Sequence, residues 1–415
     1  MEKKKLKIGV MGARMGGSHA RCFSVLMDDA EVVAICEQNE DIWDALKKDL
    51  SPETKFYKDF DEFIHSGIDA VVLGNYFHEH AKYAIKAFEA GVDVLSETTA
   101  APTLADCVAL VEAYEKYGRK YALAVNCCYF EAVYNMRNTL RSGKAGKIFF
   151  AEAEYNHPPE GPGAPINPEN LHWRQTLPGS YYNMHTLGAL MYATDSMPKT
   201  VWAKTMAPHD YQRPNKLMNS VGAVVITGMD NGAVYKTTGC CPFEPFSKWY
   251  RINCENMCLE TERYEWREER YIEAHPKCRI QNTHPGAEAI GLDNEEIQQI
   301  KKKAASMPAE YAHGHGGIDF YNKYHFVKYL NGEEESEFDV YRAAALSAAG
   351  ILGWYSELTG KEFRIPDFRN PEDREKVRYD TRSPFGKTEA EITLPFRLED
   401  KDKFDLYDPK YKFGL

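Results

Sequence analysis

The sequence predicts two domains of different fold class: an N-terminal α/β domain with a parallel sheet, and a C-terminal α+β domain with a mostly antiparallel open sheet. Short apolar segments alternate with helical segments as far as residue 126, and a glycine-rich turn follows the first of them. Beyond that point, segments of alternating polar and apolar residues follow one another closely. The predicted domains therefore span residues 1–126 and 127–415.

Length and composition limit the class of protein. A chain of 415 residues is long enough for two hydrophobic cores, and 43% apolar residues fit a folded globular protein. The net charge of −11 argues against nucleic acid or an anionic membrane as a partner, because both require clustered Lys and Arg. No apolar run approaches the roughly 20 residues of a membrane span, and no signal-peptide core precedes Gly12. We therefore expect a cytoplasmic protein.

The first strand and the turn after it are typical of a dinucleotide-binding (Rossmann) domain. An apolar segment at residues 6–11 leads into Gly12–Gly17, and a helical run follows at residues 18–27. Glycine permits a tight turn and close approach of the backbone to a pyrophosphate, which the helix N-terminus faces. Arg14 replaces the middle glycine of the usual G-x-G-x-x-G pattern. The loop residues that we expect to contact the cofactor are Gly12, Arg14, Met15 and Gly17.

The second predicted strand, residues 31–37, ends in an acidic residue that selects the cofactor. Glu37 follows the glycine loop by roughly 20 residues, the spacing typical of this fold. Its carboxylate can accept hydrogen bonds from the ribose hydroxyls of NAD and would repel the 2′-phosphate of NADP. The sequence therefore predicts NAD as the cofactor.

Further strand–helix units complete the predicted parallel sheet. The expected strands are residues 56–57, 68–74, 92–97 and 121–126, and the expected helices are residues 60–65, 80–90 and 104–117. Ligands bind at the carboxyl ends of parallel strands. Three loops lie there, at residues 75–80, 97–99 and 126–129, and we expect Asn75, His80 and Glu97 to contact the cofactor.

The second domain is predicted to contain an antiparallel sheet with a few helices. The expected strands are residues 148–155, 200–206, 220–227, 233–238, 250–254, 258–261 and 265–272. The expected helices are residues 131–142, 314–330 and 340–357, and a charged tail at residues 396–415 is expected to cross the surface. The turn at residues 229–232, Met-Asp-Asn-Gly, indicates a hairpin.

A run of aromatic and ionisable residues at 172–188, HWRQTLPGSYYNMHTLG, marks a loop that leads into a helix beginning near Thr186. Tyr182 and His185 stand three positions apart, which places them on one face if the helix already includes them. On the residues alone, His185 is open to a structural or a functional interpretation.

Two clusters have the composition of metal sites, but a role other than metal binding is preferred for each. The first is His78-Glu79-His80, at a predicted strand end beside the cofactor. The second comprises Cys240, Cys241, Cys254, Cys258, His275 and Cys278. Its spacing is poor for the paired cysteines of a zinc site, so reduced thiols are the preferred interpretation. No metal is predicted.

These features resemble the Gfo/Idh/MocA superfamily over nearly the whole chain. The resemblance rests on the glycine loop, on residues 75–80 and 90–97, and on the antiparallel second domain. That superfamily usually carries Glu-Lys-Pro after the strand at residues 92–97, where the lysine helps to move the proton of the alcohol being oxidised. This chain has Glu97-Thr98-Thr99, without the lysine.

Within the superfamily, the chain is most similar to the NAD-dependent α-N-acetylgalactosaminidase-like glycosidases of glycoside hydrolase family 109, which lack the same lysine. Their W-R, Y-x-x-H-x-L-G, H-G-G-M-D and V-Y-x-A-A motifs have counterparts here. These are Trp173-Arg174, Tyr182–Gly188, His315–Asp319 and Val340–Ala344, and Asn126–Tyr129 and Tyr155–His157 match two shorter motifs.

The resemblance implies a redox-neutral glycosidase that oxidises C3 of a sugar, removes the C2 proton, eliminates the aglycone and adds water. It implies His185 and Tyr182 as acid–base residues and a homodimer or homotetramer. The implied carbohydrate-binding residues are Glu97, Tyr129, His157, Trp173, Arg174 and His315. An NAD-linked sugar or cyclitol dehydrogenase and a non-catalytic sugar or NAD sensor remain alternatives. The sequence does not identify the sugar.

Overall fold

The computed structural model describes residues 5–23, 29–156, 173–206, 222–239, 247–261, 264–265, 278–282 and 319–386. These residues form two compact units, and each unit draws on separate stretches of the chain. The first contains the described residues up to 101, together with 109–129 and 319–343. The second contains residues 102–108, the described residues from 130 to 282, and 344–386.

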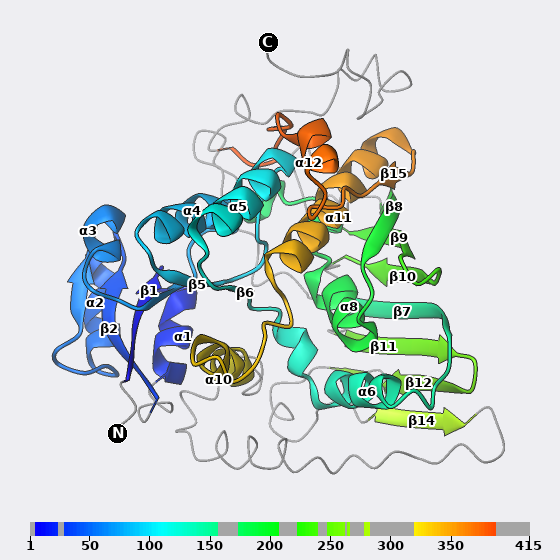
Figure 1. Cartoon of the computed structure of the whole chain (residues 1–415), viewed down its shortest axis with the longest axis horizontal. Helices are drawn as coiled ribbons and strands as arrows, with labels where there is room; N and C mark the ends of the chain where they lie inside the picture. The colour runs from blue at the N-terminus through cyan, green and yellow to red at the C-terminus, as the bar shows by residue number, and fades with distance from the viewer. Residues whose placement is uncertain are drawn as a thin grey trace. The chain divides into compact units, whose positions relative to one another are not determined.

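The first unit is built on a six-stranded parallel sheet with the order β3-β2-β1-β4-β5-β6 (Figure 1). Its strands are β1 (Leu6–Met11), β2 (Ala30–Cys36), β3 (Lys55–Tyr57), β4 (Ala70–Leu73), β5 (Asp93–Ser96) and β6 (Tyr121–Leu123). This is the Rossmann strand order, in which ligands bind where the order reverses, between β1 and β4. The predicted Rossmann fold is therefore confirmed.

The helices of this unit come from the early part of the chain, except for one that lies much later. They are α1 (Met15–Phe23), α2 (Trp43–Lys47), α3 (Phe60–Ile64), α4 (His80–Glu89), α5 (Leu104–Tyr117, of which 104–108 belong to the second unit) and α10 (Asp319–Leu330). Two 3-10 helices are η2 (Glu40–Ile42) and η3 (Asn126–Tyr129). Apolar residues of α1 and α10 share one core cluster with β1, including Val10, Phe23 and Phe320. Thus α10, late in the chain, completes the first unit.

The second unit contains a nine-stranded sheet with the order β14-β12-β11-β7-β10-β9-β8-β15, to which β13 adds by pairing with β11. Figure 1 shows these strands from β14 at the bottom to β15 at the top. The strands are β7 (Ile148–Asn156), β8 (Pro198–Thr205), β9 (Ala223–Met229), β10 (Val234–Thr238), β11 (Ser247–Cys254), β12 (Met257–Thr261), β13 (Tyr264–Glu265), β14 (Cys278–Asn282) and β15 (Phe363–Arg364). All pairings are antiparallel except β7 with β10, which confirms the predicted sheet type.

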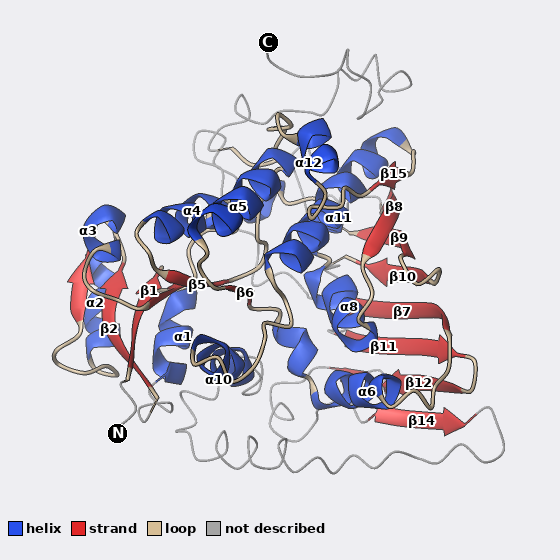
Figure 2. Cartoon of the chain, in the orientation of Figure 1, coloured by secondary structure: helices blue, strands red, loops and turns tan. Residues whose placement is uncertain are grey.

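One face of this sheet is covered by helices, among them α6 (Glu131–Arg141) and α8 (Ala189–Thr194) (Figure 2). The other helices of the unit are α7 (Trp173–Thr176), the 3-10 helix η4 (Gly179–Tyr182), the π-helix η5 (Met184–Gly188), α11 (Val340–Thr359, from 344 onward) and α12 (Pro371–Val377). Along β7, Ala151, Ala153 and Tyr155 are buried. This alternation places Tyr155 on the covered face of the sheet.

The bounds of several elements differ from the predicted ones, and the causes lie in the local sequence. The helix expected at 18–27 begins at Met15, because the last two loop glycines already adopt helical geometry. The strand expected at 121–126 ends at Leu123 and gives way to η3. The short helices α2 and α12 are not among the predicted elements. Asn370 caps the start of α12, and its side chain accepts a hydrogen bond from the Glu372 amide. The tail at 396–415 lies outside the described residues.

Candidate functional site

The glycines of the loop between β1 and α1 determine its shape. Gly12 has φ +84°, and a Cβ placed there would lie 2.6 Å from the Gly74 carbonyl oxygen. A Cβ on Gly16 would lie 2.7 Å from Cγ1 of Val10. The loops after β1 and β4 therefore approach each other closely, and α1 begins beside them at Met15. This geometry fits the pyrophosphate of a dinucleotide at the helix N-terminus.

Glu37 follows β2 and ties that strand to the glycine loop. Its Oε2 accepts a hydrogen bond from the Ala13 amide at 2.8 Å, and its Oε1 accepts one from the Asn39 amide at 2.8 Å. A carboxylate has about four acceptor positions, so both oxygens retain capacity for ribose hydroxyls. The side chains of Arg14 and Met15 are exposed on the same loop. The residues present fit the nucleotide of NAD.

The predicted cofactor residue His80 joins the loops that follow β4 and β5. Its Nδ1 lies 2.7 Å from the Thr99 carbonyl oxygen and its Nε2 lies 3.3 Å from the Asn75 carbonyl oxygen. Burial lowers the pKa of His80, so the ring is neutral, and the shorter distance assigns its proton to Nδ1. The Nδ1 proton is donated to the Thr99 carbonyl oxygen, so His80 holds the loop that follows β5. The Asn75 Oδ1 atom is buried without a hydrogen-bond partner among the described residues and can accept one from a ligand.

Glu97 follows β5 and pairs with His19 of α1, a residue that sequence analysis did not single out. Nε2 of His19 lies 2.6 Å from Oε1 of Glu97, and the imidazole is almost fully buried. Burial raises the pKa of the Glu97 carboxyl, but the hydrogen bond and charge of His19 outweigh burial and hold the pKa below its usual range. The charges of Asp319 and Lys323 on α10 also act on this carboxyl, with opposite signs. Glu97 is therefore ionised at neutral pH.

Among the buried polar atoms of the first unit that have no hydrogen-bond partner in the described part of the chain are Nδ1 of His19, Oδ1 of Asn126 and Nζ of Lys323. Asn126 follows β6, and its Nδ2 donates to Oδ1 of Asp319 at 3.3 Å. A buried polar group without a partner costs about 1–3 kcal/mol. Together with Asn75, these atoms indicate that water or a ligand supplies the missing hydrogen bonds at the carboxyl ends of the strands.

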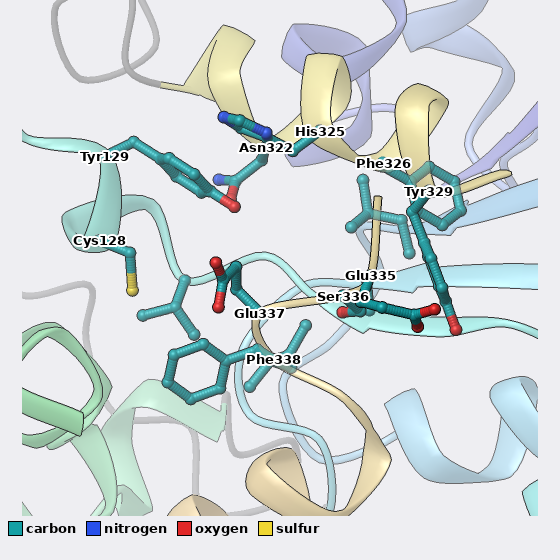
Figure 3. A pocket seen from close by; sticks show the side chains of 14 residues that line it. Cys128, Tyr129, Asn322, His325, Phe326, Tyr329, Glu335, Ser336, Glu337 and Phe338 are labelled. Carbon is teal, nitrogen blue, oxygen red and sulfur yellow. The ribbon is translucent and has the colours of Figure 1, made fainter. Parts of the chain in front are cut away.

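Tyr129 ends η3 and lines a cavity of about 20 Å³, room for about one water molecule. Its ring stacks on His325 of α10 with centroids 5.0 Å apart, and Nδ1 of His325 lies 2.7 Å from Oε1 of Glu334. Figure 3 shows the Tyr129 hydroxyl and the Glu337 carboxylate pointing into this cavity. The cavity is far smaller than a monosaccharide, and the substrate role of Tyr129 stays a prediction.

In the second unit, His185 contacts two tyrosine rings. Its ring centroid lies 4.5 Å from that of Tyr155 on β7 and 5.0 Å from that of Tyr182. The Tyr250 hydroxyl donates to the His185 carbonyl oxygen at 2.7 Å, which fixes the backbone at this point. His185 is buried, whereas Tyr182 is partly exposed. The structure thus brings together the two residues predicted to transfer protons and adds Tyr155 to them.

Tyr182 and His185 do not share a regular helix, so the condition under which their spacing would place them on one helix face is not met. Tyr182 ends the 3-10 helix η4, whereas His185 lies in the π-helix η5. The η4 turn is held by Ser180, whose amide donates to Oε1 of Glu357 at 2.9 Å and whose hydroxyl donates to the Gly350 carbonyl oxygen at 3.2 Å. A π-turn inside a helical segment frequently marks a functional site.

Asn183 links η4 to η5 and is fully buried. Its carbonyl oxygen accepts hydrogen bonds from the Thr186 and Leu187 amides, at 3.1 Å and 2.8 Å. Its side-chain Nδ2 and Oδ1 have no partner among the described residues. As in the first unit, unpartnered buried polar atoms lie directly beside residues with acid–base chemistry, which indicates a water or ligand position.

Of the four remaining residues predicted to bind carbohydrate, the structure describes the side chain of one. Trp173 begins α7 and is half-buried. The Arg174 side chain, His157 and His315 lie outside the described residues. The roles expected for these four residues therefore stay predictions.

The described residues contain no group of three or more His, Cys, Asp or Glu side chains arranged to hold a metal. Cys254 and Cys258 are buried free thiols, and burial raises the pKa of Cys254 to about 12. Cys240, Cys241 and His275 lie outside the described ranges, as does the side chain of Cys278. None of the described helices has the length and apolarity needed to cross a membrane.

Comparison with known proteins places the first unit in a family. Residues 6–125 match the model of an oxidoreductase family with an NAD-binding Rossmann fold. Over 403 residues, the chain is 25% identical to a glycosyl hydrolase family 109 protein from Solibacter usitatus, covering 88% of each protein. It is 23% identical to an alpha-N-acetylgalactosaminidase from Shewanella oneidensis over 411 residues, covering 88% of this chain and 85% of the relative.

Solved structures share the fold. An oxidoreductase from Agrobacterium radiobacter in complex with NAD+, L-tartaric acid and magnesium superposes with a TM-score of 0.67 at 14% identity, covering 87% of this chain and 99% of the other. The WlbA dehydrogenase from Bordetella pertussis, in complex with NADH and UDP-GlcNAcA, superposes with a TM-score of 0.64 at 16% identity. That match covers 88% of this chain and 99% of the dehydrogenase.

Proposed function

The chain belongs to the Gfo/Idh/MocA superfamily of NAD-binding oxidoreductases, and from this premise we propose that it is an NAD-dependent glycosidase. Bound NAD would supply reversible oxidation of a sugar C3 hydroxyl to a ketone, which acidifies the proton on C2. The proposed reaction then eliminates the aglycone from C1 and adds water across C1 and C2. Because oxidation and reduction cancel, the reaction is a net hydrolysis.

The observation that carries this proposal is the contact of His185 with Tyr155 and Tyr182. An imidazole is the side chain best suited to remove a proton near neutral pH. In the proposed reaction His185 removes the C2 proton, and the partly exposed Tyr182 donates a proton to the departing aglycone oxygen. Water then adds its oxygen to C1 and gives its proton to the Tyr182 phenolate. The proton on His185 exchanges with solvent, and His185 then protonates C2, so both groups return to their starting state.

The first unit would hold the cofactor through the residues described above. The carboxylate of Glu37 would bind ribose hydroxyls, and the N-terminus of α1 would face the pyrophosphate. Ionised Glu97 and the unpartnered Oδ1 atoms of Asn75 and Asn126 would orient polar groups at the ends of β4, β5 and β6. These are acceptors, and they suit the hydroxyl and amide donors of a nucleotide or a sugar.

A glycoside as the substrate is supported by the relatives named glycosyl hydrolase family 109 protein and alpha-N-acetylgalactosaminidase. A plain sugar dehydrogenase remains the second candidate, because the structurally similar WlbA protein is a dehydrogenase. The two reactions differ in what accumulates. Hydrolysis consumes no cofactor, whereas a dehydrogenase forms one NADH for each sugar oxidised.

The test is incubation with a panel of aryl glycosides, including an α-N-acetylgalactosaminide, and NAD⁺ in D₂O. We expect release of the phenol without net NADH, and deuterium at C2 of the released sugar. The His185→Ala variant should lose both signals, whereas His65→Ala, which alters an exposed histidine of the first unit, should keep them. NADH equal to the sugar consumed would favour a dehydrogenase. Binding without turnover or C2 exchange would identify a sensor.

A further inference from the structure

A lysine is buried on the covered face of the second unit's sheet. Lys248 of β11 is only 4% exposed, although lysine is rarely buried to this extent. In the β11–β7 register Lys248 lies directly opposite Tyr155, and Tyr250 lies opposite Ala153. Directly opposed residues of antiparallel strands point to the same face. Lys248 and Tyr155 therefore lie side by side on the face that also carries Tyr250.

Aromatic rings hold the Lys248 ammonium in place. Its Nζ lies 4.1 Å from the centroid of the Phe130 ring and 5.6 Å from that of Tyr155. Such cation–π contacts are attractive because the ring face carries negative potential. Phe130 immediately precedes α6, so the charge is held between this helix and the sheet.

This cation is close enough to act on His185. Since Nζ lies 5.6 Å from the Tyr155 centroid and that centroid lies 4.5 Å from the His185 centroid, the charge and the imidazole are no more than about 10 Å apart. In a buried setting, a positive charge at this distance disfavours protonation of the imidazole. The effect corresponds to about one pH unit with an effective dielectric constant of about 20.

We propose that Lys248 is a positioning residue that keeps His185 in its neutral, proton-accepting form near neutral pH. This role deepens the proposed function, because it rests on His185 acting as the base. Lys248 acts through the field at His185 and does not itself transfer a proton.

Other ionisable groups on the neighbouring elements have partners of their own or are neutral. Tyr155 and Tyr182 contact the His185 ring, and the Tyr250 hydroxyl donates to the His185 carbonyl oxygen. Further buried tyrosines on β10 and α8 are Tyr235 and Tyr192. Tyr235 donates to Oγ1 of Thr194, and Tyr192 lies under Arg137, whose charge Asp195 balances at 3.1 Å. On the opposite face of the sheet, Lys236 pairs with Glu152 at 2.9 Å and is 49% exposed.

The test measures the titration of His185 directly, without substrate. The full chain is prepared with ¹³C-labelled histidine, and the His185 signal is assigned by its loss in His185→Gln. In Lys248→Met and Lys248→Gln, we expect the midpoint of the His185 titration to rise by about one pH unit. Lys248→Arg should keep the wild-type midpoint because it retains the charge. Lys236→Met, which removes a charge from the exposed face, should leave the midpoint unchanged.

Both Lys248→Met and Lys248→Gln are measured, because one of them still tests the proposal if the other does not fold. Circular dichroism checks the folding of each variant. A wild-type midpoint in either folded neutral variant overturns the proposal. A shift shared by Lys248→Arg also overturns it, because packing rather than charge would then be responsible. If the midpoint shifts as expected but no glycoside is hydrolysed, the role of Lys248 stands and the proposed function fails. If glycosides are hydrolysed but the midpoint of the His185 titration does not shift, the proposed function stands and the role of Lys248 is wrong.

Discussion

The imidazole Nε2 of His19 lies 2.6 Å from Oε1 of Glu97, which joins the middle of α1 to the end of β5. The two residues are far apart in the chain, and neither position alone indicates the contact. The pair holds the strand end that carries Glu97 against the helix that follows the glycine loop. A carboxylate at the centre of the expected cofactor site is thereby kept ionised.

Because of this pair, we expect the free energy of unfolding to decrease as the pH falls into the acid range. Because the folded-state pKa of Glu97 lies below its ordinary value of 4.5, its ionised form contributes stability above that pH and loses it as the pH falls through the folded-state pKa. Glu97→Gln should therefore lower the free energy of unfolding by about 1–2 kcal/mol at pH 6, and by less at pH 4. Urea unfolding at both pH values measures the difference. Glu40→Gln, which breaks an exposed pair with Lys58, should cost little at either pH.

Replacement of Gly12 tests the glycine loop. Gly12→Ala combines a strained positive φ with a Cβ 2.6 Å from a backbone oxygen, so we expect at least a tenfold loss of NADH affinity. Gly91→Ala is the matched control, because Gly91 has φ +77° but no atom within 4 Å of the added Cβ. That variant should lose about 1 kcal/mol of stability and keep its affinity for NADH. Fluorescence titration with NADH and thermal unfolding provide both measurements; equal affinities would contradict the expectation.

Glu37 should select NAD over NADP. Its carboxylate lies beside the Ala13 amide, where the 2′-phosphate of NADP would meet a like charge. We expect wild-type protein to bind NADH about 100-fold more tightly than NADPH, and Glu37→Gln to narrow this ratio about tenfold. Glu31→Gln removes the same charge from an exposed position on β2, the strand that precedes Glu37, and should leave the ratio unchanged. Identical ratios in the wild type and Glu37→Gln would exclude Glu37 as the selecting residue.

Substitution of two adjacent tyrosines, Tyr181 and Tyr182, should affect stability in one case and activity in the other. The Tyr181 hydroxyl donates to the Pro102 carbonyl oxygen at 3.0 Å, and burial raises its pKa well above the ordinary value, so it stays protonated. Tyr181→Phe should cost about 1 kcal/mol of stability and leave turnover intact. Tyr182→Phe should lower turnover by about 10²-fold or more with little change in melting temperature. The opposite pattern would assign the functional hydroxyl to Tyr181.

The elements that were predicted well are those whose signals are local. Helix α5 was predicted at residues 104–117, and it spans Leu104–Tyr117, because its apolar spacing and the glycine after it are both visible in sequence. The parallel sheet of the first unit is predicted from repeated strand–helix units, and the structure shows such a sheet. The glycine loop and Glu37 were likewise found by short-range spacing, and the structure joins them through Ala13.

The residues that were missed depend on contacts between distant segments. His19 stands out only when Glu97 is placed against α1, and Lys248 only when β11 is aligned with β7. The alternation of β7 could have placed Tyr155 on the buried face, but no local signal says that His185 faces it. The π-helix at Met184–Gly188 also escaped prediction, because its residues are compatible with an ordinary helix.

Strand β7 lies between β10 and β11, two strands that are neighbours in the chain. Consecutive strands usually pair as a hairpin, but β10 and β11 each pair with β7, which lies much earlier in the chain. Formation of these pairs therefore requires closure of a long loop. Tyr155 belongs to that inserted strand, and a slip of one residue would turn its ring to the opposite face. A chain in which β7 has not paired in the correct register therefore lacks the contact between Tyr155 and His185, on which the proposed acid–base chemistry depends.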